Sequence, residues 1–84
     1  MITRKFERQV LRERRISNGI TQKFIASKLG YSQSTPYYNI EKGTKNPTVG
    51  EALVIAEILG RTVEELFFED KLLIYRKVRE LNTN

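Results

Sequence analysis

The chain has 84 residues, 39% of them hydrophobic and 30% charged, which suits one small globular domain but not two. It contains no cysteine and no histidine. This excludes disulfides and thiolate metal sites and removes the usual general base, so we expect no enzyme, metal or cofactor. Neither a signal-peptide pattern nor an apolar run near the roughly 20 residues of a membrane-spanning helix occurs, so we expect a soluble, cytoplasmic protein without a membrane partner.

Charge is distributed unevenly along the chain. The net charge is +5 overall, with +7 in residues 1–50, −5 in residues 51–70 and +3 in residues 71–84. A basic half beside an acidic segment indicates a polarised surface that suits a polyanion such as nucleic acid. Many cytosolic domains are mildly basic for other reasons, so charge alone does not identify a partner.

Signals for the start and the end of a helix alternate along the sequence. Glycines that can end a helix follow four segments of helical character, at positions 19, 30, 43 and 60. Capping-box spacings, in which a threonine precedes a glutamate by three residues, occur at Thr48 and Thr62. These signals predict five helices and no strand. The helices are expected near residues 3–18, 22–29, 33–42, 49–59 and 63–68.

Apolar residues at helical spacing predict which side chains form the core. Tyr37 lies three residues before Ile40 and shares its face, so Tyr37 should be buried and Tyr38 should face solvent or a ligand. The other expected core residues are Phe6, Val10, Leu11, Phe24, Ile25, Leu29, Leu53, Ile55, Ala56, Leu59, Leu66, Phe67 and Phe68.

The C-terminal segment has two interpretations. Apolar residues at helical spacing predict an amphipathic helix over residues 70–81 that covers the core or a partner, and the alternative is a frayed end. We prefer the helix. The chain then divides into a domain of residues 1–69 and a C-terminal extension of residues 70–84, which would serve in dimerisation and end in a frayed tip.

Residues 21–34 have the pattern of two helices that cross through a very short turn. Ala26 is small where the following helix passes close to it, Gly30 can take the left-handed conformation that reverses the chain, and Ser32 can cap the next helix. A plain helical hairpin would also fit this pattern. The neighbouring segments are needed to decide between the two.

Those segments match one family in order and at nearly its spacing. From about Leu11 to Phe67, two thirds of the chain, the sequence resembles the Cro/repressor-type helix-turn-helix family, also called the xenobiotic-response-element family. The matching segments are residues 18–22, 26–30, 32–34, 40–43, 46–47 and 59–67.

The resemblance implies an all-α, five-helix, lambda-repressor-like domain that docks its third helix in the major groove of double-stranded DNA. It also implies a sequence-specific transcriptional regulator, and we expect a repressor that binds a palindromic operator as a homodimer. An antitoxin that represses its own operon and a controller of a restriction–modification operon are variants of this function. The competing class is a protein-interaction module, which would bind a polypeptide through apolar residues on the third helix.

The resemblance assigns roles to individual residues. Base edges are expected to be read by Gln33, Ser34, Tyr38 and Asn39, in or at the start of the third helix. DNA phosphates are expected to be bound by Gln22, Lys23, Ser32, Lys42, Thr44, Lys45 and Asn46. Arg15 and Glu41 match a pair that holds the third helix against the first.

The third helix departs from the family pattern. Ile40 lies ten positions after Gly30, where the family has nine. If Ser32 caps the helix, Pro36 is its fourth residue and removes one hydrogen bond; if Thr35 caps it, Pro36 takes the favoured first position and the preceding turn lengthens. We prefer Ser32, with a local distortion at Pro36.

Overall fold

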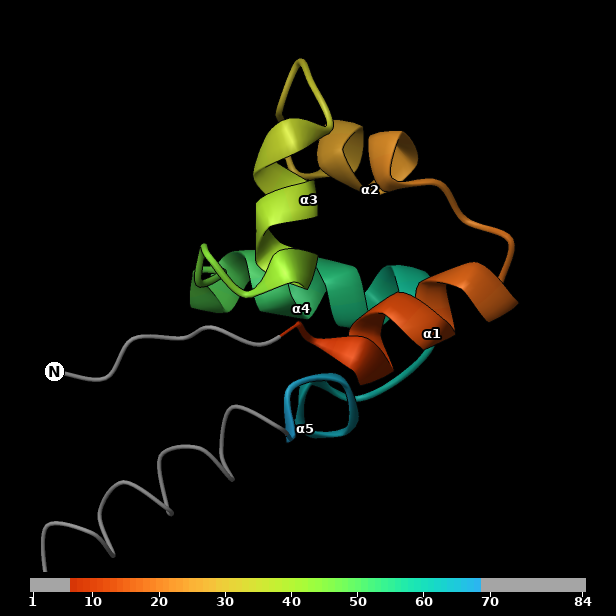
Figure 1. The fold of residues 1–84 in the computed structure, drawn as a ribbon. Coiled ribbons are helices and arrows are strands. Elements are labelled where there is room, and N and C mark those ends of the chain that lie inside the picture. Colours follow the sequence, from red (N-terminus) through yellow and green to blue (C-terminus); the bar gives the residue numbers. More distant parts are fainter. Residues whose placement is uncertain (1–6, 69–84) are drawn as a thin grey trace, which may run out of the picture.

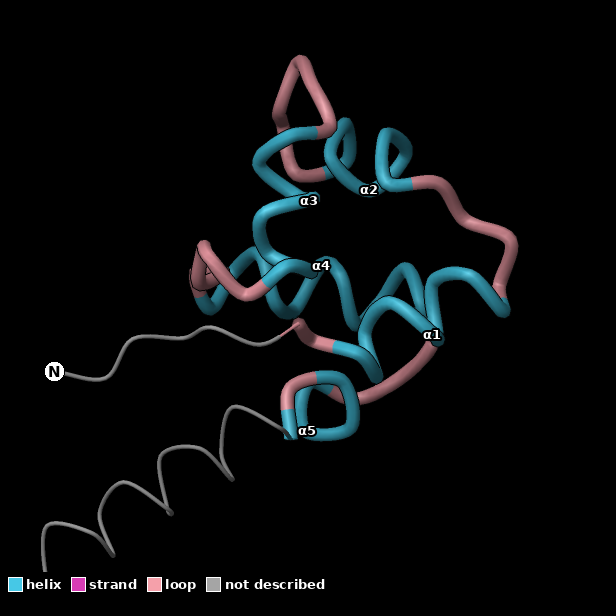
Figure 2. The backbone as a smooth tube through the Cα atoms, in the orientation of Figure 1, coloured by secondary structure: helices cyan, strands magenta, loops and turns pink. Residues whose placement is uncertain are grey.

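Five short helices and no strand make up residues 7–68, the part of the chain that the computed structural model describes (Figures 1 and 2). They are α1 (Gln9–Ser17), α2 (Gln22–Lys28), α3 (Thr35–Lys42), α4 (Val49–Leu59) and α5 (Val63–Leu66). The predicted all-α class and the number and order of these helices are confirmed. Residues 3–6 of the first expected helix and the whole helix expected over residues 70–81 lie outside the described residues.

α1 and α4 occupy the middle of the domain, between the other three helices (Figure 1). Figure 1 shows α2 and α3 together at the top of the molecule and α5 at the bottom, with α1 and α4 between them. None of the helices in residues 7–68 has the length and apolar character needed to span a membrane.

The predicted capping boxes start α4 and α5. Thr48 Oγ1 accepts a hydrogen bond from the backbone N–H of Glu51 at 3.0 Å, and the Glu51 carboxylate accepts one from the backbone N–H of Thr48 at 3.0 Å. Thr62 and Glu65 repeat this arrangement at 3.1 and 3.0 Å. Each box gives partners to two backbone donors that the first turn of a helix leaves unpaired, and so fixes where the helix begins.

The start of α3 differs from the prediction. Ser34 is the N-cap residue and Thr35 the first helical residue, so the expected Ser32 cap with a helix from residue 33 is wrong. Pro36 falls in the first turn, where the N–H that proline lacks has no partner within the helix anyway, and the first helical bond runs from Tyr38 N to Ser34 O at 2.9 Å. The extra residue therefore lengthens the turn and leaves the helix regular.

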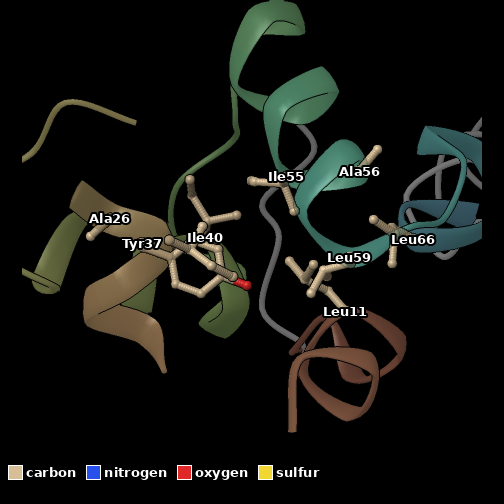
Figure 3. Packing of buried hydrophobic residues seen from close by; sticks show 9 residues of the cluster. Leu11, Ala26, Tyr37, Ile40, Ile55, Ala56, Leu59 and Leu66 are labelled. Carbon is tan, nitrogen blue, oxygen red and sulfur yellow. The ribbon is translucent and has the colours of Figure 1, made fainter. Parts of the chain in front are cut away.

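The core lies where the five helices meet (Figure 3). Tyr37 and Ile40 of α3 are both fully buried in it, as their spacing predicts. The other buried members of the cluster are Leu11, Ile25, Ala26, Ile55, Ala56, Leu59 and Leu66.

Three of the expected core residues lie on the surface instead. Phe24, Leu53 and Phe68 are 46%, 58% and 51% exposed. On α4 the buried row runs through Ala52, Ile55, Ala56 and Leu59, and Leu53 lies about 100° around the helix from Ala52. The apolar stretch of α4 is therefore wider than the face that the domain buries.

Candidate nucleic-acid interface

α2 and α3 cross through the turn that projects at the top of Figure 2. Ala26 is 1% exposed at their contact, and its carbonyl accepts hydrogen bonds from Leu29 N at 3.1 Å and from Tyr31 N at 3.0 Å. Gly30 has a φ of +93°, a conformation that a residue with a Cβ rarely adopts. The small residue and the glycine therefore occupy the positions that the sequence pattern predicts for them.

A shallow hollow of about 460 Å³ lies between this turn, α3 and the loop after α3. It is lined by Gln33 and Asn39, two of the expected base-reading residues, and by Ser32 and Lys45, two of the expected phosphate-binding residues. Gln33 lies in the turn and not in the helix, because α3 begins two residues later than predicted. Tyr31, Thr35 and Pro36 complete the lining.

The remaining expected base-reading residues lie outside this hollow. Ser34 is half-buried at the N-cap, where its side chain makes no capping hydrogen bond. Tyr38 is exposed, as predicted, and Lys42 lies one turn further along: its Nζ is 5.6 Å from the centre of the Tyr38 ring and donates to the Tyr38 hydroxyl at 3.3 Å.

The loop after α3 folds back onto the C-terminal end of the helix. The carbonyl of Asn39 accepts hydrogen bonds from the backbone N–H groups of Gly43 at 3.0 Å, Thr44 at 3.0 Å and Lys45 at 3.1 Å. The backbone geometry of this loop thus holds Thr44 and Lys45 next to α3, with the side chain of Thr44 exposed and that of Lys45 half-buried.

Glu41 is the centre of a buried polar cluster that joins three helices. Its carboxylate is 4% exposed and accepts hydrogen bonds from Arg15 Nε, from Arg15 Nη2 at 3.3 Å and from Gln22 Nε2 at 3.1 Å. The hydrogen bond to Glu41 raises the pKa of Arg15. The structure thus brings Arg15 and Glu41 together, and α1 and α2 are both tied to the same point of α3.

Gln22 lies at the first turn of α2, beside the exposed Lys23, where the resemblance places a phosphate contact. Its amide nitrogen already donates to Glu41, which fixes the direction of the side chain. A primary amide carries two N–H groups, so this bond is compatible with a second bond to a phosphate oxygen.

Comparison with known sequences agrees with this geometry. The helix-turn-helix family model matches residues 11–66, which span the first four helices almost entirely and reach the end of α5. The chain belongs to the Cro/repressor-type helix-turn-helix family. A protein of Archaeoglobus fulgidus named as an uncharacterized HTH-type transcriptional regulator is 37% identical over 60 residues, covering 71% of this chain and 84% of the relative. No solved structure matches the chain.

Membership of this family makes the chain a transcriptional regulator with a DNA-binding fold. In such a domain the third helix is the recognition helix and the second lies across it. The hollow, the exposed Tyr38 and the loop after α3 all border the recognition helix, so they form one candidate surface for DNA.

Arg8 is buried beneath this surface, a position that was not predicted from the sequence. It is fully buried, and its Nη1 donates to the carbonyl of Ile40 at 2.5 Å and to the carbonyl of Lys45 at 2.9 Å. Its Nη2 donates to Asn46 Oδ1 at 2.9 Å, and its backbone N–H donates to the carbonyl of Glu41 at 2.7 Å. Arg8 thus gives partners to the carbonyls at the C-terminal end of the recognition helix and fixes the loop that follows.

A signal for Arg8 was present in the spacing of the first helix. Arg8, Leu11 and Arg15 are three and four residues apart, which places all three on one helical face. Since Leu11 was expected in the core and Arg15 was expected to pair with Glu41, that face also had to contact the third helix. The bonds from Arg8 to the carbonyls of Ile40 and Glu41 in α3 agree with this. The guanidinium carbon also lies 5.7 Å from the centre of the Phe67 ring, just after α5.

An apolar groove of about 360 Å³ lies along α4 and α5 and begins at the end of the loop after α3. Val49 and Leu53 of α4, Val63 of α5 and Phe67 just after α5 line it, together with Asn46 of the loop, and Val49 and Leu53 are 79% and 58% exposed. The exposed apolar residues of α4 thus form a surface distinct from the hollow beside the recognition helix.

Proposed function

We propose that this regulator is a sequence-specific repressor that binds a palindromic operator in double-stranded DNA as a homodimer. The observation that carries the proposal is the hollow beside the recognition helix, which is lined by Gln33, Asn39, Ser32 and Lys45. Glutamine and asparagine can each pair bidentately with adenine in the major groove, while lysine binds phosphate as a point charge. One surface then carries both the groups that read sequence and the groups that hold the backbone.

In the proposed complex the start of α3 and the turn before it face the base edges. Gln33, Ser34, Tyr38 and Asn39 read the operator. The phosphates on one side of the groove are bound by Gln22, Lys23 and Ser32, and those on the other side by Lys42, Thr44, Lys45 and Asn46. Phosphate contacts set the position of the protein on the duplex but carry no sequence information themselves.

Repression requires neither catalysis nor a cofactor in this scheme, because a bound dimer blocks the access of polymerase to the promoter. Two recognition helices would lie about 34–36 Å apart along the duplex, one helical turn of B-DNA. Residues 1–69 form the DNA-binding domain, and residues 70–84 extend the dimer interface.

The apolar groove along α4 and α5 supports the homodimer. Val49 and Leu53 leave apolar area open to solvent, and neither residue belongs to the proposed recognition surface. In sedimentation, Leu53→Lys should convert a dimer into a monomer that binds half-operators only weakly. Ile16→Lys, at an exposed apolar residue of α1, is the matched control and should stay dimeric. Truncation after Glu69 tests the contribution of the C-terminal extension.

Selection of bound sequences from random duplex DNA tests the function as a whole. We expect enrichment of a palindrome, and binding that weakens steeply with salt, with a log–log slope near −0.9 for each neutralised phosphate. Flat salt dependence or the absence of any enriched sequence would favour the alternative, a protein-interaction module. The outer face of α3 argues against that alternative, since its only large apolar side chain, Tyr38, lies under Lys42.

A further inference from the structure

The lengthened turn before α3 is attached to α4 by one side chain. Tyr31 follows Gly30, lines the hollow with Gln33, and packs its ring against the core. Its hydroxyl donates a hydrogen bond to Oε2 of Glu51, in the first turn of α4. This bond crosses twenty positions of sequence and joins the segment that precedes the recognition helix to the one that follows it.

The carboxylate of Glu51 makes this bond in addition to its capping bonds. While Oε2 accepts from Tyr31, Oε1 accepts from the backbone N–H of Thr48 at 3.0 Å. Burial disfavours the charged form of Glu51, but the bonds from Tyr31 and Thr48 and the nearby Lys45 outweigh it and lower the pKa of the carboxyl. The hydrogen bond to Glu51 in turn raises the pKa of Tyr31.

The second capping box shows that capping a helix and bonding to a tyrosine are separate roles of the glutamate. Glu65 caps α5 through Thr62 with bonds of 3.0 and 3.1 Å, and no tyrosine donates to its carboxylate in residues 7–68. A capping box is therefore complete without a bond of this kind. The Tyr31–Glu51 bond is an additional restraint, and it acts on the turn.

We propose that Tyr31 and Glu51 are positioning residues for base recognition: their hydrogen bond holds the lengthened turn so that Gln33 faces the operator. The proposal rests on the function proposed above. A turn with one extra residue has more accessible conformations, and a hydrogen bond to an ionised acceptor is strong enough to select among them. Neither residue needs to touch DNA for this effect.

Tyr31→Phe is the direct test, because it removes the hydroxyl and keeps the ring. Affinity for the selected operator should fall about three- to tenfold, less than the full contribution of a hydrogen bond to a charged group because the freed turn still samples the reading conformation, while affinity for random duplex should change less than about twofold. The thermal midpoint of unfolding is measured alongside. A ratio of specific to random affinity that equals that of the natural protein would overturn the proposal.

Variants at Glu51 distinguish positioning from direct contact with DNA. Glu51→Ala should lower the ratio as Tyr31→Phe does, the double variant should lower it no further, and Glu51→Gln, which keeps a polar partner for the hydroxyl, should restore most of it. Glu65→Ala is the matched control, since it removes a capping carboxylate without a tyrosine, and it should leave the ratio unchanged.

Each remaining outcome has a definite meaning. If Tyr31→Phe weakens operator binding but Glu51→Ala does not, the tyrosine contacts DNA itself and the positioning role is wrong. If Tyr31→Phe fails to fold, the comparison of Glu51→Ala with Glu65→Ala decides, and equal ratios overturn the proposal. If the natural protein does not bind duplex DNA at all, the proposed function fails, which is a different result from a failure of the positioning role.

Discussion

The recognition helix is held in different ways along its length. From Tyr37 to its C-terminal end, the firmly held part, Tyr37, Ile40 and Glu41 are buried, and Glu41 accepts bonds from both α1 and α2. Arg8 binds the carbonyls of Ile40, Glu41 and Lys45. This part is fixed to the scaffold by charge-assisted hydrogen bonds in a largely buried site, where such bonds are stronger than at the surface.

In the loosely held part, which is the turn before α3 and the first residues of the helix, the restraints are few. Thr35 is exposed, Ser34 makes no side-chain cap, and the turn before them is tied to α4 through Tyr31. Side chains that read bases have to reach solvent and so cannot be fixed by burial. A helix anchored at one end can present the other end in a defined direction and still leave its reading residues exposed. The extra residue of this chain lies at the loosely held end, where it disturbs no core contact.

The largest effect on the free energy of unfolding is expected where the firmly held part of α3 loses its bonds to Arg8. Arg8→Ala should lower the free energy of unfolding by about 3 kcal/mol, because a fully buried side chain is removed and the carbonyls of Ile40 and Lys45 lose a charged donor. Denaturant unfolding measures this change. Arg12→Ala, at an exposed position of the same helix, is the control and should change it by less than about 0.5 kcal/mol.

Arg8→Lys makes this prediction more specific. Lysine keeps the charge but lacks the planar fork that reaches three acceptors at once, so it should recover less than half of the loss. Full recovery would mean that charge and not geometry anchors the helix, and a loss below about 1 kcal/mol for Arg8→Ala would remove Arg8 as the anchor.

The next effect concerns the cluster at Glu41. Glu41→Ala leaves Arg15, which is only 12% exposed, without its carboxylate partner, and should destabilise the domain by about 2–3 kcal/mol. Replacing both residues by leucine removes the stranded charge and should restore part of that stability. A double leucine variant whose loss of stability equals the sum of the losses in Arg15→Leu and Glu41→Leu would show that the pair is not coupled.

These firmly held contacts were partly predictable from the sequence. The family pattern pairs Arg15 with Glu41, and local signals such as the threonine–glutamate boxes and the glycine in the turn set most helix ends within a few residues. Arg8 was not predicted: its spacing from Leu11 and Arg15 places it on the core-facing side, but its acceptors are carbonyls more than thirty positions away, which local spacing does not reveal. Leu53 was misplaced because helical periodicity identifies an apolar face but not the width that the fold covers.

The structure of the loosely held part, the turn and the first residues of α3, was harder to predict from the sequence. Residues 32–35 supply three hydroxyl side chains that could each cap a helix, and local rules do not rank them. In the structure the cap falls on Ser34, between the two caps that the sequence suggests, Ser32 and Thr35, and Pro36 lies in the first turn. The hollow that joins Gln33, Asn39 and Lys45 follows from this longer turn and is visible only in three dimensions.

DNA-binding measurements allow a direct comparison of the turn before α3 with the loop after it. Gln33→Ala, in the turn, should cost about 1–3 kcal/mol on the selected operator and relax the preference at one base pair. Lys45→Ala, in the loop after α3, should weaken operator and random DNA about equally and reduce the salt slope by about 1. Gel-shift titrations on both DNAs at several salt concentrations measure the difference. If Gln33→Ala leaves the sequence preference intact, the reading residues lie further along α3.

The smallest effect on the free energy of unfolding is expected from alkaline pH, which acts on the firmly held part of α3 at Tyr37. Burial, then the nearby Glu41 carboxylate, raises the pKa of Tyr37 far above its usual value. Because the folded state keeps the phenol neutral, the contribution of Tyr37 to stability is complete below pH 10, the ordinary tyrosine value, and is lost as the pH rises towards the folded-state pKa. Between pH 10 and 11 this should remove about 1 kcal/mol.

Tyr37→Phe separates this effect from the titration of the lysines. No described group makes a hydrogen bond of normal geometry with the Tyr37 hydroxyl, so its removal should leave stability at pH 7 unchanged within about 1 kcal/mol. The variant should also lose less stability than the natural protein between pH 10 and 11. Identical pH profiles for the two would show that the hydroxyl is accessible to water, and that α3 packs against α1 at Tyr37 more loosely than the structure indicates.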